Sequence, residues 1–153
     1  MAMHTWFECK IRYEKVMENG MQKKVTEPYL VDALSFTEAE ARIIEEMTPF
    51  ISGEFTVSDI KRANYSELFP SDEESADRWF KCKLIFITLD EKSGAEKKTS
   101  TQVLVQAADL RDAVKKLDEG MKGTMADYQI GMVSETPLMD VYPYSAEPND
   151  KPE

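Results

Sequence analysis

Apolar and polar residues alternate with a period of two along two stretches of the chain that resemble each other. The first is WFECKIRY, which begins at Trp6, and the second is WFKCKLIF, which begins at Trp79. Period-two alternation with aromatic and β-branched residues is typical of a half-buried β-strand. The pattern therefore predicts strands over residues 6–17 and 79–89. The rows predicted to face the core and meet the helices are Phe7, Cys9, Ile11 and Tyr13 in the first strand and Phe80, Cys82, Leu84 and Phe86 in the second.

Each of these strands is followed by a polar turn, a second extended stretch and an amphipathic helix. The second strands are predicted over residues 23–34 and 97–107, because both stretches keep alternating apolar positions. Ser35 or Thr37 is the predicted N-cap of the first helix and Asp109 that of the second. Apolar residues at helical spacing are Phe36, Ala39, Ile43 and Met47 in the first helix and Leu110, Ala113, Leu117 and Met121 in the second.

A third extended segment follows each predicted helix, over residues 54–69 and 127–142. Both segments are long and irregular, so each is open to being two short strands joined by a bulge or bend. The apolar positions of the first half match those of the second, and the differences in length fall in turns. A duplicated structural unit behaves in this way, and the sequence predicts two tandem β-β-α-β repeats.

The predicted fold class is α+β, with the two repeats forming antiparallel sheet and both helices packed on one side. Short connections favour the strand order 2-1-3 within a repeat. Residues 1–70 are assigned to the first repeat and residues 79–144 to the second, as one pseudo-symmetric domain. The acidic stretch 71–78 is the expected linker, and the Pro-rich stretch 145–153 is the expected disordered tail. Whether the repeats share one continuous sheet stays open, because edge pairing leaves no local signal.

Charge and composition narrow the classes of partner. The chain of 153 residues has 29 acidic and 19 basic side chains and a net charge of −10, which disfavours generic binding to nucleic acid or to an anionic membrane. No apolar run approaches the ~20 residues that a membrane-spanning helix needs. The start has no secretory signal, and two cysteines do not make an extracellular disulfide framework. A cytoplasmic protein with reduced thiols is the expectation.

Strand alternation places a distinctive set of side chains on the face opposite the predicted core. Tryptophans from both repeats would lie there among lysines and an arginine. Aromatic rings beside cations can bind single-stranded nucleic acid, because bases stack on the rings and the cations neutralise phosphates. The candidate nucleic-acid-binding residues are Trp6, Lys10, Arg12, Trp79, Lys81 and Lys83. The structural alternative is that each tryptophan packs on a neighbouring loop or repeat, with lysines over its ring.

Other chemistry finds little support in the sequence. His4 is the only histidine, so no His-based triad or HExxH zinc site can be built, and the glycines form no phosphate-binding loop. We expect no catalytic residue, no metal site and no cofactor. Glu67 and Asp140 occupy matching places in the two repeats and are a carboxylate pair that a catalytic hypothesis would use, although strand-end solvation explains them equally well.

The stretches WFECKIRY and LVDALSFTEAEA also carry a resemblance. The chain resembles an uncharacterised bacterial family that is known only as a domain of unknown function, over about residues 3–144. The resemblance implies a bacterial or bacteriophage origin and implies no activity, substrate or site residue.

Two functions from different classes follow from these observations. The first is a non-enzymatic protein-interaction module with an unidentified protein partner, open to forming a homodimer through strand edges or an exposed sheet face. The alternative is a single-stranded nucleic-acid-binding protein that uses the Trp/Lys face. The alternative requires exposed tryptophans, which is a structural prediction.

Overall fold

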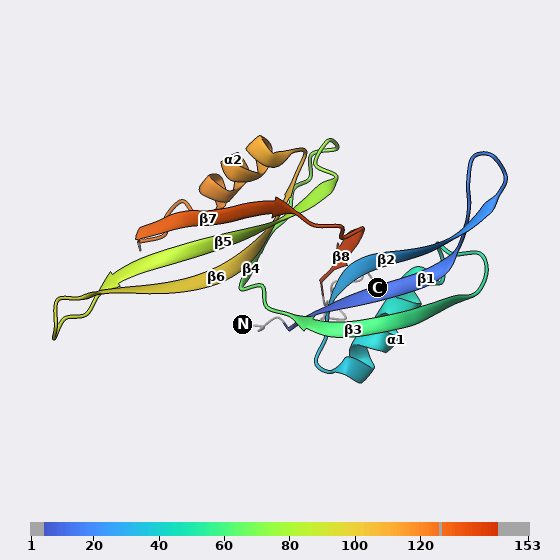
Figure 1. The fold of residues 1–153 in the computed structure, drawn as a ribbon, viewed down its shortest axis with the longest axis horizontal. Coiled ribbons are helices and arrows are strands. Elements are labelled where there is room, and N and C mark those ends of the chain that lie inside the picture. Colours follow the sequence, from blue (N-terminus) through green and yellow to red (C-terminus); the bar gives the residue numbers. More distant parts are fainter. Residues whose placement is uncertain (1–4, 126, 144–153) are drawn as a thin grey trace, which may run out of the picture. The chain divides into compact units, whose positions relative to one another are not determined.

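The structure, a computed structural model, describes residues 5–125 and 127–143 (Figure 1). The described chain forms two compact units. Unit 1 contains the described residues up to Asn64 and those from Leu138 onward, and unit 2 runs from Tyr65 to Pro137. Each unit is α+β, with one helix and one four-stranded sheet. His4 and the predicted disordered tail, residues 145–153, lie outside the described residues.

Unit 1 has a sheet in the order β3-β1-β2-β8 with one helix on one of its faces (Figure 1). Strand β1 is antiparallel to both of its neighbours, whereas β8 is parallel to β2. The elements of unit 1 are β1 (Trp6–Val16), β2 (Gln22–Asp32), α1 (Phe36–Met47), β3 (Phe55–Ala63) and β8 (Asp140–Tyr142).

Unit 2 has the same arrangement of strands, in the order β7-β5-β6-β4. Strand β5 is antiparallel to β6 and β7, whereas β4 is parallel to β6. The hairpin of β5 and β6 runs on beyond the end of the helix that covers the sheet (Figure 1). The elements of unit 2 are β4 (Glu67–Phe69), β5 (Arg78–Leu89), β6 (Glu96–Ala107), α2 (Leu110–Gly120) and β7 (Asp127–Glu135).

The predicted strand order 2-1-3 is observed in both units, but the last strand of each sheet comes from the other half of the sequence. Strand β4 follows β3 along the chain and pairs with β6, and β8 follows β7 and pairs with β2. The prediction of purely antiparallel sheet is wrong at these two edges. Both predicted third segments do consist of two strands, and it is the second, three-residue strand that crosses over.

Local chemistry explains where the chain leaves the sheet of unit 2. After β7, Thr136 donates its N–H and its hydroxyl to the carbonyl oxygen of Trp79, at 2.8 and 2.9 Å, and Pro137 follows without an N–H to continue the ladder.

The two compact units differ from the predicted boundaries 1–70 and 79–144, because β4 belongs to unit 2 and β8 to unit 1. The expected linker, residues 71–78, lies inside unit 2, where all of it except the first residue of β5 belongs to the connection between β4 and β5.

Each unit has an apolar core between its helix and its sheet. Both helices begin at the predicted type of cap, since the side chains of Ser35 and Asp109 accept hydrogen bonds from Glu38 N and Asp112 N. The residues of the first strand predicted to face the helix are in these cores. The buried core residues are Phe7, Cys9, Ile11, Val31, Ala33, Ala39, Ile43 and Met47 in unit 1 and Phe80, Cys82, Leu84, Val103, Val105, Ala107, Ala113 and Leu117 in unit 2.

Burial of the two thiols predicts how stability depends on pH. Burial raises the pKa of Cys9 from its ordinary value of 9.0 to about 12 and that of Cys82 to about 11. Above pH 9 the unfolded chain releases these protons while the folded chain keeps them, so stability is full below pH 9 and falls as the pH rises through 11 and 12.

Urea unfolding measured from pH 7 to 11 should show this loss. The double variant Cys9→Ala and Cys82→Ala should have a flatter dependence between pH 9 and 10, the range below the ordinary pKa of tyrosine. Parallel pH profiles for the two proteins would contradict the assignment to the thiols.

Candidate functional site

The predicted tryptophan face is not a solvent-exposed surface. Only 2% of Trp6 and 5% of Trp79 is exposed, so the exposed tryptophans that the nucleic-acid alternative requires are not observed. The residues beside them on the same face, Leu30 in β2 and Leu104 in β6, are fully buried. Strand alternation correctly placed these side chains opposite the helix, but this end of that face is apolar and covered.

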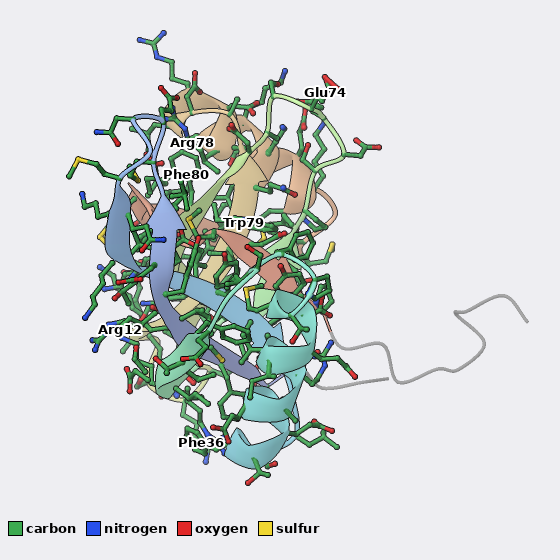
Figure 2. All side chains as sticks on the ribbon, turned by 90° about the vertical axis from the view of Figure 1, so that its right-hand side faces the viewer. Arg12, Phe36, Glu74, Arg78, Trp79 and Phe80 are labelled. Carbon is green, nitrogen blue, oxygen red and sulfur yellow. The ribbon has the colours of Figure 1, made fainter. Side chains whose placement is uncertain are left out.

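The predicted basic residues lie on the same strands and differ in how exposed they are. Lys10, Lys81 and Lys83 are half-buried, and Arg12 is exposed and extends away from its unit (Figure 2). Lys10 and Arg12 share β1 with Trp6, and the other three candidates share β5. Since neither indole is open to a base, these residues do not form the stacking surface that the nucleic-acid hypothesis requires.

Unit 2 contains a different candidate site, on the helix side of its sheet near the start of β4. A pocket of about 300 Å³ opens there between β4, β5, β6 and the end of α2. Its apolar lining is Phe69, Leu84, Phe86, Val103 and Met121, and its more polar lining is Ser66, Glu67, Thr101 and Thr124. Gly120 completes the wall, because a Cβ there would lie 2.9 Å from the ring of Phe69.

The edge of β6 beside this pocket is only partly paired. Strand β4 covers β6 from Val103 to Val105, and the last contact of this pairing is Ser66 N to the carbonyl oxygen of Gln102, at 2.8 Å. Backbone groups of alternate strand residues point to the same edge. The N–H and C=O groups of Lys98 and Ser100 therefore point to this edge, where no other strand pairs among the described residues.

Unit 1 fills the matching space with its own side chains. Tyr29 pairs with Cys9 as Val103 pairs with Cys82, and Glu27 pairs with Ile11 as Thr101 pairs with Leu84. Larger residues thus replace Val103 and Thr101 at the same register. The Tyr29 ring stacks on Tyr142 with centroids 6.2 Å apart, and Tyr142 is the counterpart of Phe69.

Glu27 is the polar centre of this filled space. The carboxylate is 9% exposed and accepts hydrogen bonds from the hydroxyls of Tyr13 and Tyr29, at 3.0 and 3.2 Å, with Lys15 Nζ at 3.7 Å. Burial, together with the charge of Glu27, raises the pKa of Tyr29, and burial raises the pKa of Tyr142 to about 12. Both tyrosines stay neutral at physiological pH, and Tyr29 donates to Glu27, so the cluster is a packed and hydrogen-bonded replacement for a pocket.

A second hollow in unit 2, of about 700 Å³, also has Phe69 and Gly120 in its lining. Its cation is already paired, because Lys116 Nζ lies 2.8 Å from Glu73, 3.0 Å from Asp112 and 3.1 Å from Ser71 Oγ. The hydrogen bond to Glu73 is the main reason that the pKa of Lys116 is raised. These contacts fasten the β4–β5 connection to α2, while Glu74 stands on the outside of that connection (Figure 2).

The remaining groups show no further chemistry within the described ranges. Glu67 begins β4 in unit 2, and Asp140 begins β8 in unit 1. Both residues are exposed. No set of three or more His, Cys, Asp or Glu residues among those described is arranged to hold a metal ion. None of the described helices is long and apolar enough to span a membrane.

The sequence contained a signal for the pocket that the period-two pattern alone does not show. Because the turns after the first strands differ in length by one residue, the second strands align at a shift of 74, which places Thr101 opposite Glu27 and Val103 opposite Tyr29. At both positions the residue of the second half has the smaller side chain, and the two positions are neighbours on one face of a strand. A local loss of side-chain volume against a conserved register predicts a cavity, but only once the pairing partners are known.

Comparison with known proteins adds the family. No curated protein and no solved structure matches this chain. A family model does match, over residues 5–144, which is nearly the whole chain and agrees with the resemblance seen in the sequence. The chain belongs to the family described as a domain of unknown function, DUF4494.

Proposed function

We propose that this protein is a non-enzymatic protein-interaction module that binds an extended segment of a partner protein. The segment would add a strand to the free edge of β6 and place one side chain in the pocket of unit 2. The observation that carries the proposal is the juxtaposition of an unpaired strand edge at Lys98 and Ser100 with an apolar pocket lined by Val103. Backbone pairing would supply affinity, and the pocket would supply specificity.

Two further features support strand addition at this place. The edge already accepts the three-residue strand β4 in parallel orientation, so its free part continues a pairing that exists. The pocket is lined mainly by apolar side chains with hydroxyls from Ser66 and Thr101 at its rim, which is the usual composition of a ligand pocket.

The proposal gives the two halves of the chain different tasks. If the halves arose by duplication, as the matching apolar positions suggest, unit 1 has closed the pocket with Tyr29 and Glu27 and unit 2 has kept it open. Unit 1 then provides an internal control for every experiment, because its β2 edge has the same register and carries Tyr29 and Glu27 at the pocket positions.

Substitution of Ser100 by proline is expected to weaken peptide binding at least about tenfold without unfolding unit 2. The N–H of Ser100 points to the free edge. Proline therefore removes the donor that β6 would offer to the incoming strand, and it leaves the β5–β6 ladder intact. The probe is a phage-displayed library of random dodecapeptides selected on the full chain, followed by calorimetry with the enriched peptides.

The control is Thr26→Pro, the same change at the matching outward position of β2, which should leave the affinity unchanged. A second variant, Val103→Tyr, copies the residue by which unit 1 fills its own pocket and should also abolish binding, with circular dichroism reporting that the fold persists. Failure to enrich any peptide, or equal affinity for the Ser100→Pro and Thr26→Pro proteins, would overturn the proposal.

A further inference from the structure

We infer that the partner segment carries an aromatic side chain, tyrosine or phenylalanine, as its anchor, with acidic residues close to it on one side. The inference rests on the proposed function and specifies the chemistry of the partner. Two independent observations carry it: the residue that occupies the matching space in unit 1 and the distribution of charge along the free edge of β6.

The aromatic anchor follows from comparing the two units at one register. In unit 1, the position that pairs with Cys9 is Tyr29, and its ring fills the space against Tyr142. In unit 2, the position that pairs with Cys82 is Val103, and the space against Phe69 is a pocket of about 300 Å³. The pocket therefore corresponds to a missing aromatic ring. An incoming ring would stack on Phe69 as Tyr29 stacks on Tyr142.

The polar partner of that ring differs between the units. In unit 1 the hydroxyl of Tyr29 donates to Glu27. In unit 2 the matching residue is Thr101, whose hydroxyl lies 2.8 Å from Ser66 Oγ at the rim. A threonine and a serine offer hydroxyl groups in place of a carboxylate, so the pocket accepts tyrosine and phenylalanine alike.

The preference for acidic residues follows from the charges beside the free edge. Lys97 and Lys98 lie at its outer end, both are exposed, and neither has a carboxylate partner among the described residues. Glu67 lies at the other end, where β4 begins. The two lysines outnumber the neighbouring carboxylate of Glu96 at this end of β6, so the groove has a basic end and an acidic end. Acidic residues of the segment would lie toward the two lysines. The segment should therefore be more acidic at the end near Lys97 and Lys98 than at the end near Glu67.

The test uses one synthetic octapeptide and three relatives, titrated into the ¹⁵N-labelled full chain. The parent peptide has blocked ends, one central tyrosine, two aspartates on one side of it and threonine, serine or valine elsewhere. One relative replaces tyrosine by alanine, one replaces it by leucine, and one replaces both aspartates by asparagine. The amide signals of Lys98 and Ser100 report strand addition, and those of Lys24 and Thr26 report the matching edge of unit 1.

The expected result is that the parent peptide shifts the Lys98 and Ser100 signals and that alanine in place of tyrosine weakens binding at least about tenfold. Leucine should bind less tightly than tyrosine. Asparagine in place of aspartate should weaken binding roughly two- to fivefold at low salt, and the double variant Lys97→Glu and Lys98→Glu should remove that difference.

Distinct outcomes would overturn the inference and the proposed function. Equal affinity for the tyrosine and alanine peptides, with the Lys98 and Ser100 signals still shifting, would refute the aromatic anchor and leave strand addition standing. Equal affinity for the aspartate and asparagine peptides would refute the charge preference. No shift with any of the peptides, together with concentration-dependent broadening of the same signals without peptide, would show that the edge pairs with a second copy and would overturn both.

Discussion

Ending the chain at Pro137 is expected to destabilise unit 1 by about 4 kcal/mol and to leave unit 2 folded. The truncation removes β8, whose residues supply a parallel strand to β2, and with it the buried side chains of Leu138 and Val141 and the ring that stacks on Tyr29. Burial of one such apolar side chain stabilises a fold by roughly 1.5–3 kcal/mol. The effect is selective because β4, the fourth strand of unit 2, lies before the truncation point.

Hydrogen exchange of the backbone amides measures this effect unit by unit. Amides of β1 and β2 should exchange faster in the truncated chain, whereas those of β5 and β6 should not change. A chain that ends at residue 144 is the control, since it keeps β8 and should behave as the full chain does. Equal protection of β1 and β2 in both truncated chains would mean that β8 contributes nothing to unit 1.

Replacement of Trp79 by alanine is expected to cost about 3–5 kcal/mol of folding free energy. The indole is 5% exposed at the start of β5, and its removal leaves a large void beside the fully buried Leu104. Urea unfolding gives the loss of stability, and the emission maximum of the native chain should be that of indole shielded from water.

Arg78→Ala is the matched control for this substitution. The side chain of Arg78 is 52% exposed and its ion pair with Glu135 spans 3.7 Å, so its removal should cost less than about 1 kcal/mol. If Trp79→Ala were as stable as Arg78→Ala, or if single-stranded oligonucleotide quenched the native fluorescence, the tryptophan would be a surface group after all.

The elements of the fold could be predicted because each has a local cause. Alternation along WFECKIRY and WFKCKLIF gave both first strands and the residues that face the helices, including Cys9 and Cys82. The helix starts could be predicted from capping residues: Asp109 was expected, and Ser35 is the cap of the two residues considered, Ser35 and Thr37. Their side chains satisfy N–H groups of the first turn. These features depend on neighbours in the chain, which a sequence displays directly.

The exchange of the last strands could not be predicted for the opposite reason. Strands β4 and β8 have three residues each, so their own patterns are too short to specify a partner. Their pairing with β6 and β2 depends on residues distant in the sequence. The same limit left the exposure of Trp6 and Trp79 open, because alternation gives the face of a strand but not what covers that face.

The candidate site could not be predicted from the sequence, because the pocket lies where side chains of unit 2 are smaller than their counterparts in unit 1. Thr101 and Val103 are ordinary strand residues in an alternating pattern. They become informative only when pairing with Leu84 and Cys82 shows that they occupy the places of Glu27 and Tyr29. A pocket of this kind is visible as a difference between two copies of one arrangement.

Hydrogen exchange of four amides, measured with and without bound peptide, tests strand addition to β6 directly. A peptide selected on the full chain should slow exchange at Lys98 and Ser100, because a new strand accepts and donates hydrogen bonds there. No change is expected at Lys24 and Thr26, the matching positions of unit 1. Slowed exchange at Lys24 and Thr26, or at none of the four, would contradict a peptide site on the edge of β6.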